Sequence, residues 1–125
     1  MSAAKQETFG PVFIANAAGN LVAPAAAGAG GVGYTATADV LFIKHIRIVN
    51  KTAGAVTYTL YKGATGGSAS GTEVVGAGKS VAANSAEDMY FSPALRLEGA
   101  NGFLTGVAGS ANALVFTAEG EVSKV

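Results

Sequence analysis

The feature that most constrains the fold of this chain is a series of short runs in which apolar and polar residues alternate. Successive side chains of a β-strand point to opposite faces, so this alternation is typical of a strand with one buried face. Glycine, asparagine and proline separate the runs at intervals of about 8–12 residues, as turns do in sandwiches and jelly rolls. No stretch longer than about two helical turns has the periodicity of a helix. The sequence therefore predicts an all-β fold, either an antiparallel β-sandwich or a jelly roll.

The clearest alternation occurs in two neighbouring runs, FIKHIRIVN at 42–50 and AVTYTLYKG at 55–63. In the first run Ile46 and Ile48 share one face, which we expect to be buried. In the second run Tyr58 points the same way as the apolar residues two positions before and after it. The residues KTAG between the runs favour a turn. We therefore predict that the two strands pair as a β-hairpin.

Further short strands are predicted along the rest of the chain, with turn residues in the gaps between them. They are the runs TEVV, KSVAA, EDMYFS, LRLEG, FLTGVAG and ALVFTAEGEV. In the last run Leu114 and Phe116 alternate with Val115 and Thr117, which again predicts one buried face. Strands without intervening helices favour antiparallel over parallel sheets.

The first 33 residues differ in character from the rest. The run FGPVFIANAAGNLV predicts one or two short strands around a turn, but the tract from Ala23 to Gly33 is mostly alanine and glycine. Such a tract buries little apolar surface, and ordering its glycines costs backbone entropy. We predict that residues 1–33 form an extended Ala/Gly-rich N-terminal arm with one or two short strands, and that residues 34–125 form the β-sandwich domain.

Charged residues make up 13% of the chain, about half the share in an ordinary soluble domain. A surface with so few charges indicates a chain that is covered by other protein, and hence a homo-oligomer. Eight basic residues balance eight acidic ones without a basic stripe, which argues against nucleic-acid binding. No apolar run reaches the roughly 18 residues of a membrane span, and the opening residues MSAAKQETFG lack the pattern of a signal peptide.

Two glycine-rich motifs match nucleotide-binding loops in part. The residues GAGKS, at 76–80, lack the first glycine of a phosphate loop, because Glu73 holds that position, and a strand rather than a helix is expected after them. Gly28, Gly30 and Gly33 have the dinucleotide-binding spacing, but neither a strand before them nor a helix after them is expected. We therefore expect no cofactor and no small-molecule substrate.

No group of residues has the spacing of a catalytic or metal site. His45 is the only histidine, no acidic residue stands beside it in the sequence, and the chain has no cysteine. The acidic pairs Glu87–Asp88 and Glu119–Glu121 fit solvated strand ends. The prediction is a protein that is not an enzyme, with no catalytic residue and no metal ligand, in which His45 is a surface or interface residue.

From Tyr34 to Val122 the pattern of the chain resembles that of small virion proteins of tailed bacteriophages. The likeness rests on the strand HIRIVN, the strand AVTYTLYKG, the later VAANS, the LRL strand and the terminal strand ALVFTAEGEV. It implies a structural protein that is made in the host cytoplasm and located on the capsid surface, foremost a head-decoration (cement) protein. Such a protein would form trimers and contact the major capsid protein or other virion proteins. A tail or neck subunit, and a glycan-binding jelly-roll module for host attachment, are the alternatives.

The expected contact surfaces are the apolar part of the arm and the exposed faces of the strands. Tyr61 points away from Tyr58, so it is the better exposed aromatic residue of its run. The candidate interface residues are Phe9, Val12, Phe13, Ile14, Leu21, Val22, His45 and Tyr61.

Overall fold

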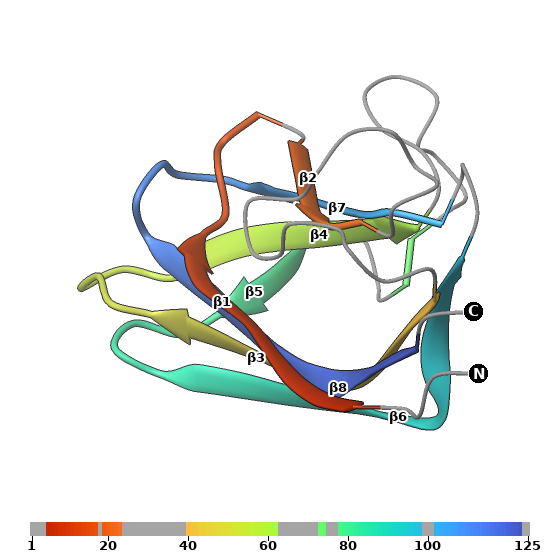
Figure 1. Ribbon diagram of the computed structural model, residues 1–125. Helices are drawn as coiled ribbons and strands as arrows, with labels where there is room; N and C mark the ends of the chain where they lie inside the picture. Colours follow the sequence, from red (N-terminus) through yellow and green to blue (C-terminus); the bar gives the residue numbers. More distant parts are fainter. Residues whose placement is uncertain are drawn as a thin grey trace.

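The computed structural model describes residues 5–17, 19–23, 40–62, 73–74, 78–98 and 102–123. These residues contain eight β-strands and no helix, which confirms the all-β prediction (Figure 1). The strands are β1 (Lys5–Phe13), β2 (Gly19–Val22), β3 (Val40–Asn50), β4 (Val56–Lys62), β5 (Lys79–Val81), β6 (Ala86–Glu98), β7 (Leu104–Ala108) and β8 (Leu114–Ser123).

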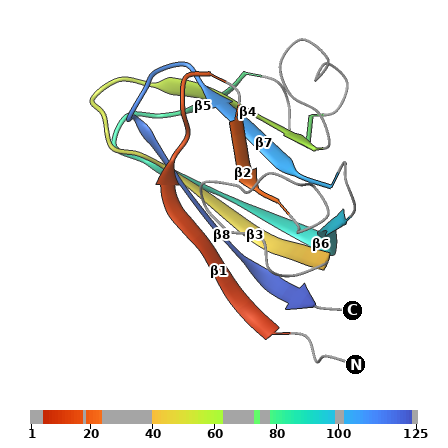
Figure 2. The ribbon, with the colours of Figure 1, turned by 45° about the horizontal axis from the view of Figure 1, so that its top comes forward.

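The strands form two antiparallel sheets of four strands each. The first sheet has the order β1-β8-β3-β6, and the second sheet has the order β2-β7-β4-β5. Figure 2 shows the two sheets as two layers, with β1, β8, β3 and β6 in one layer and β2, β7, β4 and β5 in the other. Consecutive strands lie in opposite sheets except for β4 and β5, so most connections cross from one layer to the other.

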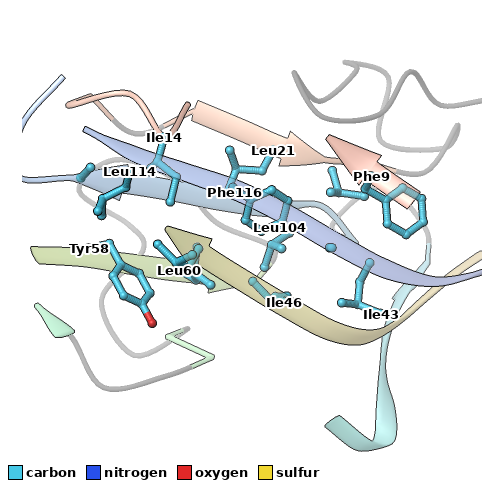
Figure 3. Packing of buried hydrophobic residues seen from close by; sticks show 14 of the residues in the cluster. Phe9, Ile14, Leu21, Ile43, Ile46, Tyr58, Leu60, Leu104, Leu114 and Phe116 are labelled. Atoms are coloured by element: carbon cyan, nitrogen blue, oxygen red, sulfur yellow. The ribbon is translucent and has the colours of Figure 1, made fainter. Parts of the chain in front are cut away.

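One hydrophobic core fills the space between the sheets (Figure 3). Both sheets contribute side chains that are at most 1% exposed, among them Ile46, Phe116, Tyr58 and Leu60. Each of these lies on the face that the alternation in its run predicted to be buried. The faces predicted for β3, β4 and β8 are therefore confirmed, because a two-residue period leaves only one face for the apolar side chains.

The predicted hairpin between β3 and β4 is wrong, although both strands are present. Strand β3 pairs with β6 and β8 in the first sheet, whereas β4 pairs with β5 and β7 in the second. The residues KTAG therefore form a connection between layers rather than a hairpin turn. Because each strand turns one apolar face to the core, the two strands can meet the same core from opposite sides without pairing with each other.

Asn50, at the end of β3, holds this connection in place. Its side chain is 1% exposed, and its Nδ2 donates to the carbonyl oxygens of Gly54, at 2.9 Å, and Val81, at 3.0 Å. Its Oδ1 accepts hydrogen bonds from the backbone N–H and the hydroxyl of Thr52. A buried amide with every group satisfied fixes the path of the corner, since leaving any of them unpaired would cost stability.

The runs EDMYFS and LRLEG, predicted as separate strands, belong to the single strand β6. Pro93 lies between the two runs, and the pairing of β6 with β3 shifts register near this point. Because β6 is an edge strand of the first sheet, the missing N–H of Pro93 interrupts no pairing on its outer side. Of the predicted strand TEVV only residues 73–74 are described, and Glu73 forms an isolated bridge with Tyr61.

Both short strands expected in the first 33 residues are present, and both belong to the sheets. Strand β1 pairs with β8 from Lys5↔Val122 to Phe13↔Val115, and β2 pairs with β7. Strands β1 and β2 are therefore edge strands of the two layers, paired with strands of the predicted 34–125 domain. The Ala/Gly tract from residue 24 to 33, on which the expectation of an extended arm rests, lies outside the described residues, as does the predicted boundary at 33/34.

Candidate functional site

The outer face of the first sheet carries a cluster of polar and aromatic side chains around His45. The Nε2 of His45 lies 2.7 Å from Oδ1 of Asp88 on β6, and its Nδ1 lies 3.6 Å from Oε1 of Glu119 on β8. The Nη1 of Arg47 lies 3.4 Å from the same oxygen of Asp88. Three neighbouring strands thus supply charged groups to one place on the sheet.

Tyr90 of β6 covers the imidazole ring of His45. The two rings are stacked, with their centroids 4.6 Å apart and an angle of 19° between their planes. The side chain of His45 is only 19% exposed, whereas Tyr90 is 77% exposed. We refer to His45, Arg47, Asp88, Tyr90 and Glu119 together as the His45 cluster.

A β-bulge in β3 sets the position of His45. The register of β3 with both β6 and β8 shifts between Ile43 and His45. Ile43 and Ile46 are both fully buried although they are three residues apart, so the alternation breaks between them. The bulge brings His45 to the outer face. Gly120 of β8 pairs with Ile43, at the start of this bulge. A Cβ atom on Gly120 would be 1.8 Å from the carbonyl oxygen of Phe42, so a larger residue would push β3 and β8 apart.

No sequence pattern indicated this cluster, because the partners of His45 come from other strands. Asp88 is exposed near the start of β6, as a solvated strand end would be, but its side chain also contacts both His45 and Arg47. The side chain of Glu119 is 65% exposed. Only the register of β6 and β8 with β3 could have indicated the contacts.

Both ring nitrogens of His45 face carboxylates, Asp88 at Nε2 and Glu119 at Nδ1. In the part of the chain that the structure describes, no group of three or more His, Asp or Glu side chains is placed to hold a metal ion. The exposed ring of Tyr90 and the charged groups around it are the parts that a ligand can reach.

An apolar groove lies where β1 and β2, the outer strands of the two sheets, come together. It has a volume of about 410 Å³ and is lined by Val12, Phe13, Ala15, Gly19, Asn20, Leu21 and Gly106. Phe13 at its edge is 41% exposed, and the Nζ of Lys51 lies 5.1 Å from the centroid of its ring. With Tyr90, Phe13 is one of the two large apolar side chains that are exposed among the described residues.

The eight candidate interface residues fall into four places. Four of them are at most 2% exposed and belong to the core: Phe9, Ile14, Leu21 and Val22. Val12 and Phe13 line the groove, where Leu21 also reaches its floor. His45 belongs to the cluster. Tyr61 on β4 is half-buried and therefore less exposed than predicted. Among the described tyrosines, Tyr90 is the well-exposed one.

The motif GAGKS leads into a strand, as predicted. Lys79 and Ser80 begin β5 and pair with Tyr58 and Thr57 of β4. Gly78 has a φ of 65°, a left-handed conformation that glycine adopts without strain, and its N–H donates to the hydroxyl of Thr59. The described part of the motif is thus the entry to a strand at the edge of the second sheet.

Glu87 joins the two sheets instead of lying free in solvent, contrary to the prediction. Its Oε1 accepts a hydrogen bond of 2.5 Å from the hydroxyl of Tyr58, and the Nζ of Lys79 lies 3.7 Å from the same oxygen. Burial raises the pKa of the Tyr58 phenol above its ordinary value, and the hydrogen bond and negative charge of Glu87 raise it further. Tyr58 is buried, as its place in the alternation predicted.

The described residues include no helix of the length and apolar character that a membrane span requires. Comparison of the chain with models of protein families, with curated proteins and with solved structures finds no match.

Proposed function

We propose that this chain is a non-enzymatic structural protein of a tailed-phage virion, acting as a decoration (cement) protein that stabilises the head. In this role it forms trimers and binds the major capsid protein on the capsid surface. The observation that carries the proposal is the strand order, β1-β8-β3-β6 and β2-β7-β4-β5. Eight strands divided in this way support a jelly roll, an architecture found in viral capsid and lectin domains. Its agreement with the phage-like sequence pattern favours the virion over other uses of the fold.

The surface favours assembly with other protein. The chain has half the usual share of charged residues, and its groove combines an exposed phenylalanine with two outer strands. An outer strand presents backbone N–H and C=O groups along its free side, to which another chain can add. Each such contact is weak by itself, but many identical contacts on a symmetric shell add up, as linked binding sites do.

A catalytic role is not supported by the cluster that comes closest to an active site. The side-chain contacts of His45 are a hydrogen bond to Asp88 and an ion-pair distance of 3.6 Å to Glu119, and neither partner is a nucleophile of the serine or threonine kind. A tail or neck subunit would use the same kind of surface, and the location on the particle separates the two.

The test is the mass of the purified chain in solution, followed by its binding to phage heads. We expect sedimentation equilibrium to give about 37 kDa, three times the 12.3 kDa of one chain. We also expect the protein to bind expanded heads of the parent phage that lack it, and to raise the temperature at which those heads break. A protein that stays monomeric at millimolar concentration and does not bind these heads would refute the proposal. Binding to tails alone would assign it to the tail or neck.

A further inference from the structure

We propose that Tyr90 and the polar side chains around it form a binding site for a pyranose ring of a glycan. Tyr90 lies on the outer face of the first sheet and is 77% exposed, an unusual position for so large an aromatic side chain. One face of its ring rests on the imidazole of His45, with 4.6 Å between the centroids. Its other face is open to a ligand.

The ring of Tyr90 rests on a side chain that has partners of its own. His45, on which it rests, is fixed by Asp88 on one side and Glu119 on the other. A platform that is already ordered loses little conformational entropy on binding, so more of the contact energy appears as affinity.

The charged groups beside the ring can form hydrogen bonds with the hydroxyl groups of a sugar. A pyranose has a flat face of C–H groups, which packs on an aromatic ring, and a rim of hydroxyl groups that donate and accept hydrogen bonds. The carboxylates of Asp88 and Glu119 are acceptors, and the guanidinium of Arg47 is a donor. Their side chains are 30%, 65% and 52% exposed, so all three can reach a ligand. Small-ligand sites combine an aromatic surface with a few placed polar groups in this way.

The same surroundings disfavour Tyr90 as a contact between protein subunits. The centre of a protein interface is depleted of charged residues, and a tyrosine anchor there lies in a desolvated pocket. Around Tyr90, a protein partner would have to remove Arg47, Asp88 and Glu119 from water, which is costly unless each is matched. A sugar leaves these groups partly hydrated. The groove at Phe13, by contrast, is apolar throughout its lining except for Asn20.

The experiment uses the full chain labelled with ¹⁵N and a panel of glucose, galactose, mannose and N-acetylglucosamine. Each sugar is added to roughly 50 mM, which detects millimolar dissociation constants, and amide shifts are followed by NMR. We expect at least one sugar to shift residues 45–47, 88–90 and 119 in a saturable manner. Tyr90→Ala should weaken this binding about tenfold, since it removes the stacking contact, whereas Tyr90→Phe should retain most of it. Phe13→Leu, which removes the other exposed aromatic ring but keeps the apolar contact of the groove, is the matched control and should bind normally.

Three results would overturn the proposal. They are no saturable shift with any sugar of the panel, equal binding by Tyr90→Ala and the unchanged chain, and shifts around residue 90 that depend on protein concentration but not on sugar. The last result would instead assign Tyr90 to a contact between copies of the chain. The first two outcomes leave the solution mass and the binding to heads unaffected, so this inference and the decoration role can fail separately.

Discussion

At the scale of single residues, a few polar side chains join parts of the molecule that the hydrophobic core alone would not align. Asn50 fixes the corner between β3 and β4, and Glu87 of the first sheet accepts a hydrogen bond from Tyr58 of the second. Both are specific contacts at the margin of an apolar core. Because a buried polar group that loses its partner is costly, such contacts select one arrangement of the layers over others that would bury similar apolar surface.

Replacing Tyr58 by phenylalanine should destabilise the protein by about 1–3 kcal/mol, because it removes a hydrogen bond to a charged group and keeps the ring. The effect should depend on pH. Below about pH 10 the phenol is protonated in both the folded and the unfolded chain. Above that pH the unfolded chain loses the proton while folded Tyr58, whose pKa is raised, retains it, so the free energy of unfolding falls as pH rises.

Urea unfolding of the unchanged chain and of Tyr58→Phe between pH 8 and pH 11 checks this prediction. The unchanged chain should lose up to about 1.4 kcal/mol per pH unit more than the variant above pH 10, so the two stabilities should converge. Parallel pH curves for the two proteins would show that Tyr58 does not titrate differently on folding, and would contradict the raised pKa.

At the scale of elements, the two N-terminal strands have the largest consequence. Strand β1 extends the first sheet and β2 extends the second, so the same segment of chain closes one side of both layers. Phe9 of β1 and Leu21 of β2 reach the core, and Ile14 joins them from the connection between the strands. These strands are part of the folding unit, so removing them is expected to affect folding and not only contacts with other subunits.

Deleting residues 1–33 should therefore unfold the protein rather than release a free domain. The deletion exposes one side of both sheets and removes the buried side chains of Phe9, Ile14, Leu21 and Val22, each worth about 2–5 kcal/mol by comparison with core truncations. Circular dichroism in the near ultraviolet and the dispersion of NMR signals are the measurements. Ile14→Ala, which keeps both strands but removes one core side chain, is the control and should unfold cooperatively at lower urea. A deleted chain that still unfolds cooperatively would show that β1 and β2 are dispensable.

At the scale of the whole molecule, the two exposed aromatic residues mark surfaces of different character. Phe13 borders an apolar groove beside the outer strands, whereas Tyr90 stands among charged groups on a sheet face. This separation assigns assembly to the groove and ligand binding to the His45 cluster in our two proposals. A subunit that is fixed to a shell through one surface can present the other to the outside.

Replacing Phe13 by aspartate should break the proposed trimer, because it places a charge at the edge of the apolar groove. We expect the mass in solution to fall from about 37 kDa to the 12.3 kDa of one chain. Since Phe13 is 41% exposed, the melting temperature of the single chain should change by no more than about 4–8 °C. Phe13→Leu, which keeps the apolar contact, should remain trimeric. If Phe13→Asp also remains trimeric, the groove is not the contact between subunits.

The sequence by itself determined which segments are strands and which of their faces are buried. Alternation is a local property, so Ile46, Tyr58 and Phe116 could be placed in the core without knowledge of any partner strand. The same reasoning distinguished GAGKS from a phosphate loop, because the residues after it read as a strand and form β5.

Only the tertiary structure decided which strands pair. The residues KTAG were predicted to form a hairpin turn, but the residue types of a turn do not determine whether the chain returns to the same sheet or crosses to the other. The contacts of His45 with Asp88 and Glu119 could not be predicted from the sequence for a related reason. They depend on the register of β6 and β8 against β3 and on the bulge before His45. Strand pairing joins residues far apart in the chain, and it is settled by the packing of all eight strands around one core rather than by any single run.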